Sequence, residues 1–212
     1  MDLCPTCSKK FESLGTHFRY HDHRPDISDK QHEIVVGLLM GDGSIGHRNR
    51  DNSNSFLSVK MRNEEFIDYL IEQFGWLARN KVIDPLNGTD YYKFETRSHP
   101  DINQYRSWYQ PDKVWPEIEI TPTILKYLYI SDGTYDTGNS HDRIMIACAK
   151  EGKHSEKIER MFRKSGYPIS RTYHYERNGR ANDYQLWFNV EETQKMFEDM
   201  GESPPGFEYK WP

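Results

Sequence analysis

Two apolar segments of this chain end in the same unusual way. The first reads VVGLLMGDG over residues 35–43, and the second reads LKYLYISDG over residues 125–133. Each places an aspartate directly before its last glycine, and these residues, Asp42 and Asp132, are 90 positions apart. Because the same order of helical and strand patterns surrounds each of them, the chain is predicted to contain two similar half-domains rather than a solenoid.

Hydrophobic periodicity places the repeated elements. In SFLSVKMR (55–62), Leu57 and Val59 alternate with Ser58 and Lys60, which predicts a half-buried strand with a basic outer face. The remaining patterns follow the same reasoning, with start signals at helix N-termini. The predicted elements are helices over 29–42, 63–80, 155–166 and 191–201, a helix through Tyr105 and Trp108, a helix from Pro122 to Asp132, strands over 55–62, 91–98, 142–149, 169–176 and 184–190, a hairpin turn over 177–183, and N-caps at Ser28 and Asn63.

The simplest interpretation of the two aspartate-glycine endings is a helix stop, with the glycine in a left-handed conformation. A carboxylate at a helix C-terminus, however, meets the negative end of the helix dipole and requires compensation. Gly37 and Gly41 leave one side of the first helix bare for close packing, and Ser131 takes the place of Gly41 in the second helix. If the helices pack side by side, Asp42 and Asp132 meet at one edge. Their repulsion then favours a bound Mg²⁺, which prefers oxygen ligands and can activate water for attack on a phosphodiester.

The two segments resemble the signature motifs of a single-chain LAGLIDADG homing endonuclease, and the resemblance covers residues 31–212. It implies an α+β fold of pseudo-symmetric tandem αββαββα repeats. In such a fold, two saddle-shaped antiparallel sheets straddle the major groove of double-stranded DNA. The half-domains are expected over 26–120 and 121–212.

The same resemblance implies which residues form the site. Asp42 and Asp132 match the acidic residues that bind the catalytic divalent ions. The carbonyl groups of Gly41 and Ser131 are expected to help hold Mg²⁺. Lys210, in the closing YKW, fits the basic residue of the family, either in catalysis or on the DNA backbone.

The net charge of −5 counts against nucleic-acid binding unless positive charge is concentrated on one face. Basic side chains do fall on the predicted strands and turns, whereas acidic residues crowd the outer helices. Separation of charge by face is what a DNA-binding saddle requires, and ordinary solvated strand faces are the simpler alternative. The predicted DNA contacts are Lys60, Arg62, Lys93, Arg97, Arg143, Arg171, His174, Arg177 and Arg180.

Residues 1–25 are predicted to form a separate module. Two cysteines and two histidines stand at the spacing of a tetrahedral Zn²⁺ site, and so short a segment could hardly fold without a metal. The module is similar to a C2H2 zinc finger, which would extend the DNA contact or act as a structural cap. A redox CxxC or an unstructured tail are the alternatives. The candidate Zn²⁺ ligands are Cys4, Cys7, His17 and His21, with His23 as the alternative last ligand.

The resemblance predicts a site-specific, Mg²⁺-dependent endonuclease that cuts both strands of a long duplex as a monomer, encoded by an intron or a free-standing mobile gene. No apolar stretch approaches the about 20 residues that cross a bilayer, so a cytoplasmic location without a membrane partner is expected. The main alternative is a cleavage-inactive relative that acts as an RNA-intron maturase or a DNA-binding regulator, and the presence of both aspartates argues against it. The endonuclease portion of an intein and an unrelated metal-binding structural protein are further alternatives.

Overall fold

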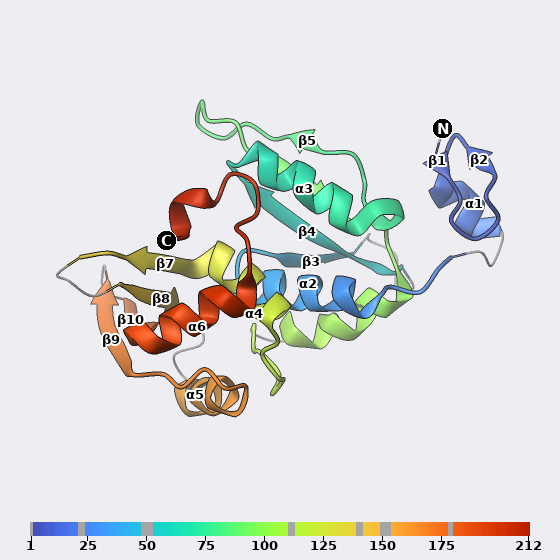
Figure 1. Cartoon of the computed structure of the whole chain (residues 1–212). Coiled ribbons are helices and arrows are strands. Elements are labelled where there is room, and N and C mark those ends of the chain that lie inside the picture. Colours follow the sequence, from blue (N-terminus) through green and yellow to red (C-terminus); the bar gives the residue numbers. More distant parts are fainter. Residues whose placement is uncertain are drawn as a thin grey trace.

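In the computed structural model, the chain folds into a small N-terminal module followed by two similar α+β halves (Figure 1). The structure describes residues 2–20, 24–47, 53–109, 113–138, 142–148, 154–177 and 180–212. Within these ranges, no helix has the length and apolar character that a membrane crossing requires. The N-terminal module has a ββα arrangement, made of β1 (Asp2–Leu3), β2 (Lys10–Phe11) and α1 (Leu14–Tyr20).

The first half begins with α2 (Asp29–Met40). Ser28 caps this helix, as predicted: its hydroxyl accepts a hydrogen bond from the Gln31 N–H, and the Gln31 side chain accepts one from the Ser28 N–H. The elements that follow are β3 (Ser44–His47), β4 (Ser55–Met61), α3 (Glu64–Phe74), η1 (Gly75–Leu77), β5 (Val82–Ile83), β6 (Tyr92–Glu95) and η2 (Pro100–Tyr109), where η denotes a 3₁₀ helix.

The second half repeats this order. Its first helix, α4 (Pro122–Asp132), has a proline in the first turn, as predicted from the sequence, and the structure shows Thr121 as its N-cap. The elements that follow are β7 (Gly133–Asp136), β8 (Arg143–Ala147), α5 (Ser155–Lys164), β9 (Arg171–Arg177), β10 (Arg180–Trp187), α6 (Val190–Met200) and η4 (Glu208–Lys210).

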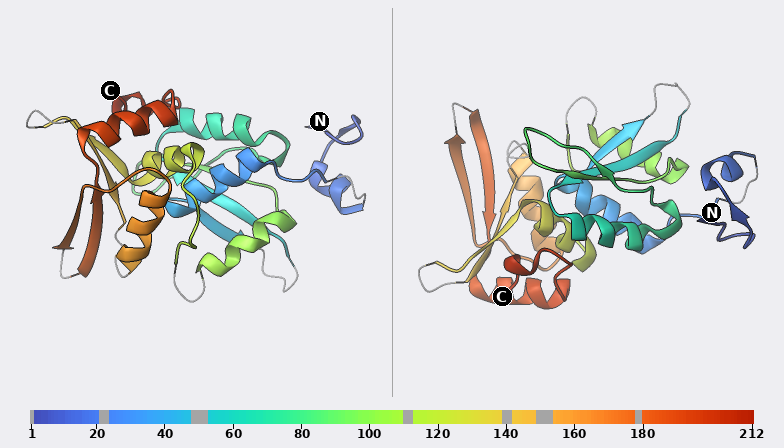
Figure 2. Two further views of the ribbon diagram at one scale, coloured as in Figure 1. Left: turned by 60° about the horizontal axis from the view of Figure 1, so that its bottom comes forward. Right: turned by 90° about the horizontal axis from the view of Figure 1, so that it is seen from above.

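Each half contains one four-stranded antiparallel sheet, with strand orders β3-β4-β6-β5 and β7-β8-β10-β9. The two orders correspond strand by strand, so the predicted pseudo-symmetric tandem fold is confirmed. The sheets lie on either side of the paired helices α2 and α4, and the N-terminal module lies at the end of the molecule opposite to β9 and β10 (Figure 2). The division of the chain at 26–120 and 121–212 stays a prediction.

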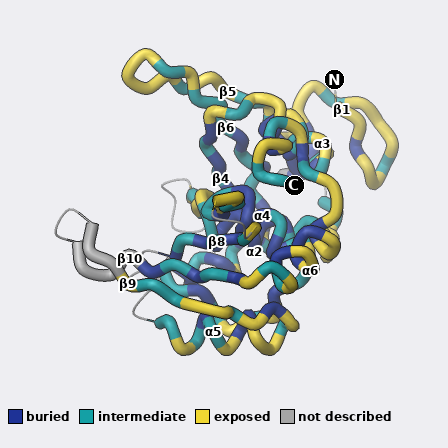
Figure 3. Tube along the Cα trace, turned by 60° about the vertical axis from the view of Figure 1, so that its left-hand side comes forward, coloured by how far each residue is buried: buried dark blue, intermediate teal, exposed yellow. Residues whose placement is uncertain are grey.

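The core lies between the inner faces of the sheets and the helices. In β4, Leu57, Val59 and Met61 are buried, whereas Ser58 and Lys60 on the other face are partly exposed, as the alternation predicted. Along the trace, buried positions gather at α2 and α4, and exposed ones lie on the outer elements, among them β5, α5, α6 and the N-terminal module (Figure 3). The basic faces of the strands therefore point away from the core.

The structure corrects two boundaries. The helix predicted over 63–80 ends at Phe74, because Gly75 takes a φ of 49° and the chain continues as a 3₁₀ turn. The hairpin turn predicted over 177–183 is mostly strand, since β10 already begins at Arg180 and pairs with β9. The polar composition of this segment indicated a turn, but pairing between backbones does not depend on side-chain polarity.

Candidate active site

Helices α2 and α4 are in direct backbone contact. A β-carbon built on Gly37 would lie 2.7 Å from the Ile124 carbonyl oxygen and 2.8 Å from Tyr127 Cβ. One built on Gly41 would lie 2.2 Å from Ser131 Cβ. Because no side chain fits such gaps, the bare side of α2 is what permits the close approach that the sequence predicted.

Both helices do end at these motifs, but without a glycine in the left-handed conformation. Gly41 and Gly133, the C-caps of α2 and α4, have φ values of −104° and −86°, and Gly43 is not among the glycines of positive φ. Gly43 instead packs against the last turn of α2, where its N–H donates to the Leu38 carbonyl oxygen at 2.7 Å. A β-carbon on Gly43 would lie 2.7 Å from that same oxygen. These glycines are therefore required for close approach rather than for a left-handed backbone.

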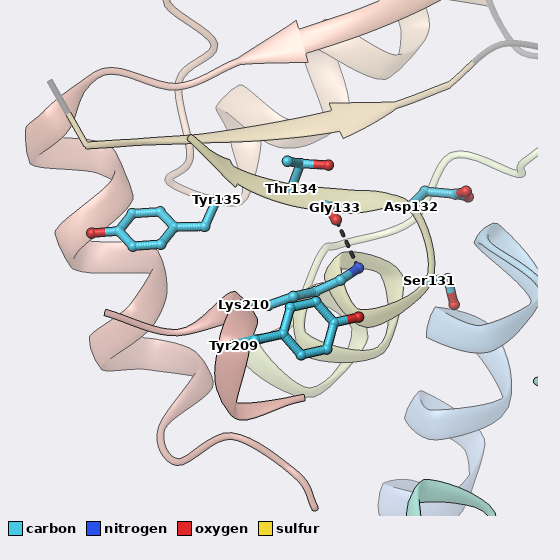
Figure 4. A pocket seen from close by; sticks show the side chains of 7 residues that line it. All are labelled: Ser131, Asp132, Gly133, Thr134, Tyr135, Tyr209 and Lys210. Atoms are coloured by element: carbon cyan, nitrogen blue, oxygen red, sulfur yellow. Dashed lines mark hydrogen bonds between the residues drawn. The ribbon is translucent and has the colours of Figure 1, made fainter. Parts of the chain in front are cut away.

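The helix contact brings the two motif aspartates to one edge. Asp132 is the last residue of α4, and Asp42 follows the end of α2 by two residues. A carboxylate oxygen of Asp132 lies 3.4 Å from the position that a β-carbon would take on Gly41, the residue directly before Asp42. In Figure 4 the Ser131 and Asp132 side chains are directed toward α2. The structure thus places both carboxylates at the same helix junction.

Each helix end is bound by a lysine from a distant part of the chain. Lys210 Nζ donates to the carbonyl oxygens of Gly133 at 2.7 Å and Ile130 at 2.8 Å (Figure 4). Lys113 Nζ donates to the carbonyl oxygen of Gly41 at 2.9 Å. These cations lie at the negative ends of α4 and α2, so they supply part of the compensation that the sequence analysis expected from a metal alone.

Lys113 is absent from the residues predicted from the sequence. The signal that could have identified it is a second, weaker repeat, because DKVWP at 112–116 and YKWP at 209–212 both place a lysine shortly before Trp-Pro. The two lysines occupy equivalent places at the ends of α2 and α4. This short repeat therefore belongs to the pseudo-symmetry of the fold.

The charges at this edge perturb one another. The Asp42 carboxylate reaches solvent, yet the protein packed around it still desolvates it and raises its pKa, against the opposing charges of Lys210 and Lys113. Burial lowers the pKa of Lys210, against the carboxylates of Asp132 and Asp42. Both ionised forms are thus partly disfavoured, and a cation bound at the carboxylates would favour the ionised form of Asp42.

The donor atoms at the helix junction suit a hard divalent cation. Asp42 and Asp132 offer carboxylate oxygens, and Gly41 and Ser131 offer backbone carbonyl groups beside them. The Gly41 carbonyl accepts a hydrogen bond from Lys113, which uses one of its two lone pairs. The residues predicted for Mg²⁺ are therefore neighbours in the fold, and their chemistry fits such an ion.

A pocket of about 390 Å³ opens beside the end of α4. It is bounded by α4, β7 and η4, and Figure 4 shows the side chains around it. Its size falls within the range of sites for small molecules or fragments of larger ones. The residues that line it are Ser131, Asp132, Gly133, Thr134, Tyr135, Tyr209 and Lys210.

On the outer face of the first sheet, the predicted DNA contacts form a cluster with acidic partners. Lys60 and Lys93 are direct cross-strand neighbours in β4 and β6. Lys60 is paired with Asp84 at 2.7 Å, and Lys93 with Glu95 at 2.6 Å. Arg62, just beyond β4, lies 5.3 Å from the centre of a tyrosine ring that Lys60 also approaches. Cations of this face are therefore partly neutralised within the protein.

The second sheet separates the predicted contacts. Arg143 and Arg171 share its outer face by register, and the Arg171 guanidinium lies 4.1 Å from the centre of the Tyr173 ring. His174 is on the opposite face, where its ring centre is 4.7 Å from that of the buried Tyr184. Because successive residues of a strand point to opposite faces, His174 does not share the outer face with Arg171.

The remaining predicted DNA contacts are Arg97, Arg177 and Arg180. Arg97 follows the end of β6 and is bound by other groups, since it donates to Asp2 of the N-terminal module at 2.9 Å and to the Trp76 carbonyl oxygen at 3.0 Å. The Arg97 side chain is therefore engaged by other groups of the protein, and its contact with DNA stays a prediction. The backbones of Arg177 and Arg180 belong to β9 and β10, and their side chains lie outside the described part of the structure.

In the N-terminal module, three candidate metal ligands converge. Ligand atoms of Cys4, Cys7 and His17 all lie within 4.8 Å of one another, and Cys7 Sγ is 3.6 Å from His17 Nε2. Burial alone would raise the pKa of the Cys4 thiol, but hydrogen bonds from the backbone of the CxxC turn lower that pKa below its ordinary value, as suits a thiolate ligand. Both candidates for the fourth ligand, His21 and His23, fall outside the described residues.

The fold and the site define a pseudo-symmetric protein with a composite site of two carboxylates and two lysines between two antiparallel sheets. The profile of a family described as the LAGLIDADG DNA endonuclease family matches residues 32–196. This match covers most of the sequence, and the chain belongs to that family. A search of curated protein sequences gave no match.

Solved structures share the fold at low sequence identity. The homing endonuclease I-WcaI bound to its DNA recognition sequence matches with a TM-score of 0.74 and 12% identity, over 97% of this chain and 96% of that chain. I-DmoI in complex with DNA and Ca matches with a TM-score of 0.51 and 15% identity, over 82% of this chain and 92% of that one. Full-length DUF199/WhiA from Thermatoga maritima matches with a TM-score of 0.52 and 12% identity, over 84% of this chain and 57% of that one.

Proposed function

We propose that this protein is a site-specific homing endonuclease that hydrolyses both strands of a long DNA duplex with Mg²⁺, acts as a monomer, and is encoded by an intron or a free-standing mobile gene. The observation that carries the proposal is the convergence of Asp42, Asp132, Lys113 and Lys210 on the contact between α2 and α4. I-WcaI with its DNA and I-DmoI with DNA and Mn or Ca have the same fold, which supports DNA and a divalent cation as partners.

The chemistry follows from the placement of these four side chains. When bound, Mg²⁺ supplies an activated water and stabilises the leaving oxygen. Asp42 and Asp132 hold it at the helix junction. Lys113 and Lys210, fixed by carbonyl oxygens, hold positive charge beside the place where a scissile phosphate gains negative charge. Because each half contributes one aspartate and one lysine, the pseudo-symmetric site can serve both strands of the duplex.

The outer faces of the two sheets bind the duplex on either side of this site. Lys60 and Lys93 exchange their pairing with Asp84 and Glu95 for phosphate oxygens or base edges. Each of these partly exposed pairs is worth at most about 1 kcal/mol, so their loss opposes binding only weakly. The cations of this face, rather than the net charge of −5, set the charge that a bound duplex meets.

The N-terminal module is the second metal site of the proposal. Cys4, Cys7 and His17, with one of the two histidines that follow, hold Zn²⁺ in a C2H2-like finger. The module is joined to the first half by Phe18, whose ring meets that of Trp76 edge-on at 5.7 Å. A finger attached in this way extends the DNA contact beyond the first sheet.

A library of randomised long duplexes tests the function. The protein is incubated with the library in Mg²⁺ or in Ca²⁺, and new DNA ends are sequenced. We expect Mg²⁺-dependent ends at one sequence, their loss in Asp42→Asn and in Asp132→Asn, and their retention in Asp68→Asn, a matched change on the exposed side of α3. Binding without cleavage under every condition would contradict the nuclease and favour a maturase or a DNA-binding regulator.

A further inference from the structure

Tyr209 is a large aromatic side chain exposed beside the proposed active site. It is 74% exposed and belongs to η4, directly before Lys210. It lines the pocket at the end of α4, and in Figure 4 its ring stands next to the Lys210 side chain, on the same side of the pocket. An aromatic ring in water at such a place offers a stacking surface to a substrate.

The neighbours of Tyr209 fix the position of its backbone. The Phe207 ring lies 6.0 Å from the Tyr209 ring in a stacked arrangement, and Phe207 is itself buried edge-on against Phe66 of α3 at 5.0 Å. On the other side, the Tyr129 hydroxyl donates to the Lys210 carbonyl oxygen at 2.6 Å. Because both flanking residues are anchored and a tyrosine has only two side-chain torsions, little conformational freedom is lost when the ring binds a ligand.

The sequence of the first half differs at the matching position. Alignment of DKVWP with YKWP places Asp112 opposite Tyr209. Asp112 lies outside the described residues, but the chemistry of its side chain is set by the sequence. A carboxylate cannot stack on a nucleotide, and it repels a phosphate. The two halves therefore differ in sequence directly before their lysines.

We infer that Tyr209 forms one wall of a nucleotide subsite that serves only one of the two DNA strands. Its ring packs against the base or deoxyribose next to the scissile phosphate that Asp132 and Lys210 serve. Stacking on an aromatic ring accepts every base, so this subsite positions the strand rather than reading its sequence. A phosphodiester held in place reacts faster, and the other strand is cut without this help. The inference rests on the proposed nuclease function.

Strand-resolved cleavage tests this inference. The recognised duplex, with a different dye on each 5′ end, is cut in Mg²⁺ by the parent and by Tyr209→Ala, Tyr209→Phe, Lys113→Met and Lys210→Met. We expect Tyr209→Ala to slow one strand on the order of tenfold and to accumulate nicked duplex. The slowed strand should be the one whose cleavage Lys210→Met slows most. Tyr209→Phe keeps the aromatic ring, so it should cleave this strand at close to the rate of the parent. Equal slowing of both strands, or slowing of the strand that depends on Lys113, overturns the inference.

A second measurement does not require cleavage. With Ca²⁺, 2-aminopurine is placed next to the central positions of each strand in turn, and its fluorescence reports stacking. Tyr209→Ala is expected to change the signal of one strand only, relative to the parent. An unchanged signal in both strands overturns the inference. Failure of the parent to cut DNA would contradict the proposed function instead, and the fluorescence comparison would still decide on Tyr209.

Discussion

Among the glycines of α2 and its C-cap, Gly41 is the one that lies closest to α4. A β-carbon there would lie 2.2 Å from Ser131 Cβ and 2.6 Å from Ser131 Oγ. We expect Gly41→Ala to lower the free energy of unfolding by about 1 to 3 kcal/mol, because the helices must move apart. The same movement separates Asp42 from Asp132, so cleavage is expected to be lost even at temperatures where the variant stays folded. Urea unfolding followed by circular dichroism, with cleavage of the recognised duplex, measures both effects.

Gly15 in α1 is the matched control for this substitution. A β-carbon on Gly15 would make only an ordinary van der Waals contact, at 3.8 Å from Ser13 Oγ. Alanine in place of a helical glycine is then expected to be neutral or stabilising by up to about 1 kcal/mol. If Gly15→Ala and Gly41→Ala lowered the free energy of unfolding equally, close approach of α2 and α4 would not be the reason for the glycine.

His99 makes the stability of the fold depend on pH. The residue is 3% exposed. The Asp101 N–H donates to His99 Nδ1 at 3.2 Å, and His99 Nε2 lies 3.1 Å from the Pro25 carbonyl oxygen. These two contacts assign the neutral tautomer of His99 with its hydrogen on Nε2. Burial lowers the pKa of His99 below its ordinary value of 6.5, against the nearby Asp101 carboxylate. The unfolded chain therefore takes up this proton first as pH falls. The stability that His99 contributes is complete above about pH 6.5 and is lost at lower pH.

Urea unfolding at a series of pH values checks this dependence. Between about pH 7 and pH 5, the free energy of unfolding is expected to fall more steeply in the parent than in His99→Gln, which has no titrating ring. The comparison variant is His32→Gln, which removes another histidine of the same half; His32 Nδ1 lies 2.7 Å from the Tyr105 hydroxyl. Parallel pH curves for the parent and His99→Gln would exclude His99 as the source of the slope.

At the scale of elements, the C-terminal strap, residues 201–212, links the two halves. It leaves α6, contacts the first half and returns Lys210 to the end of α4. Asn63 forms the contact on the first half: its side-chain N–H donates to the Gly206 carbonyl oxygen at 2.6 Å, and its oxygen accepts from the Phe66 N–H at 3.0 Å. One side chain thus caps α3 and holds the strap that carries a proposed catalytic lysine.

Asn63→Ala and Asn189→Ala separate these two roles. Asn189 caps α6 by accepting from the Glu192 N–H at 2.9 Å, so its loss costs about 1 kcal/mol, as for a helix cap. Asn63→Ala loses a cap and the bond to the strap, and is expected to cost about 1 kcal/mol more. Hydrogen exchange over 204–212 should accelerate only in Asn63→Ala, with slower cleavage at unchanged DNA affinity. Equal costs and equal exchange would mean that the hydrogen bond from Asn63 does not hold the strap.

The elements that the sequence predicted well are those with a local signal. Ser28, Asn63 and Pro122 mark helix starts correctly, and β4 follows from alternation, because a cap or a half-buried face is encoded within a few residues. The strand β10 begins at Arg180, four residues before the strand predicted over 184–190, since its pairing with β9 is set by register rather than by composition. The bonds of Arg97 to Asp2 and Trp76 join segments distant in the chain, so periodicity could not predict them.

The same distinction explains what could be predicted of the site. Asp42 and Asp132 stand in repeated apolar motifs, so the sequence alone indicates that they are related and meet. Lys113 reaches Gly41 across 72 positions of the chain, through a segment without helical or strand periodicity. Only the short Lys and Trp-Pro repeat connects it to Lys210. A contact made by an irregular segment is a property of the tertiary fold, which periodicity cannot report.

At the scale of the whole molecule, the N-terminal module has a core of its own. Cys4, Leu14 and Phe18 are buried together, apart from the continuous core that both halves of the nuclease share. Trp76 packs at the edge of each cluster and joins them. Three buried side chains supply too little apolar burial to fold some 20 residues, so the stability of the module depends on its proposed metal.

Removal of the metal should therefore unfold the module and leave the nuclease folded. We expect one Zn²⁺ per chain in the parent and in Cys148→Ala, a change in the buried core of the second half, and none in Cys7→Ser. Mass spectrometry of the intact chain counts the ion. In Cys7→Ser, hydrogen exchange over 2–20 should become fast while that of α2 and α4 stays slow. Loss of exchange protection in α2 as well would mean that the module is an integral part of the first half.

The affinity of Cys7→Ser for the recognised duplex then decides what the module contributes. A finger that extends the contact adds phosphate neutralisation, so its unfolding should weaken binding and reduce the steepness with which affinity falls as salt increases. Cleavage at saturating protein should persist, because the carboxylates and lysines at the helix junction belong to the separate core. Unchanged affinity and salt dependence would instead identify the module as a structural cap, which meets the first half through Trp76 and Arg97 and leaves DNA binding to the sheets.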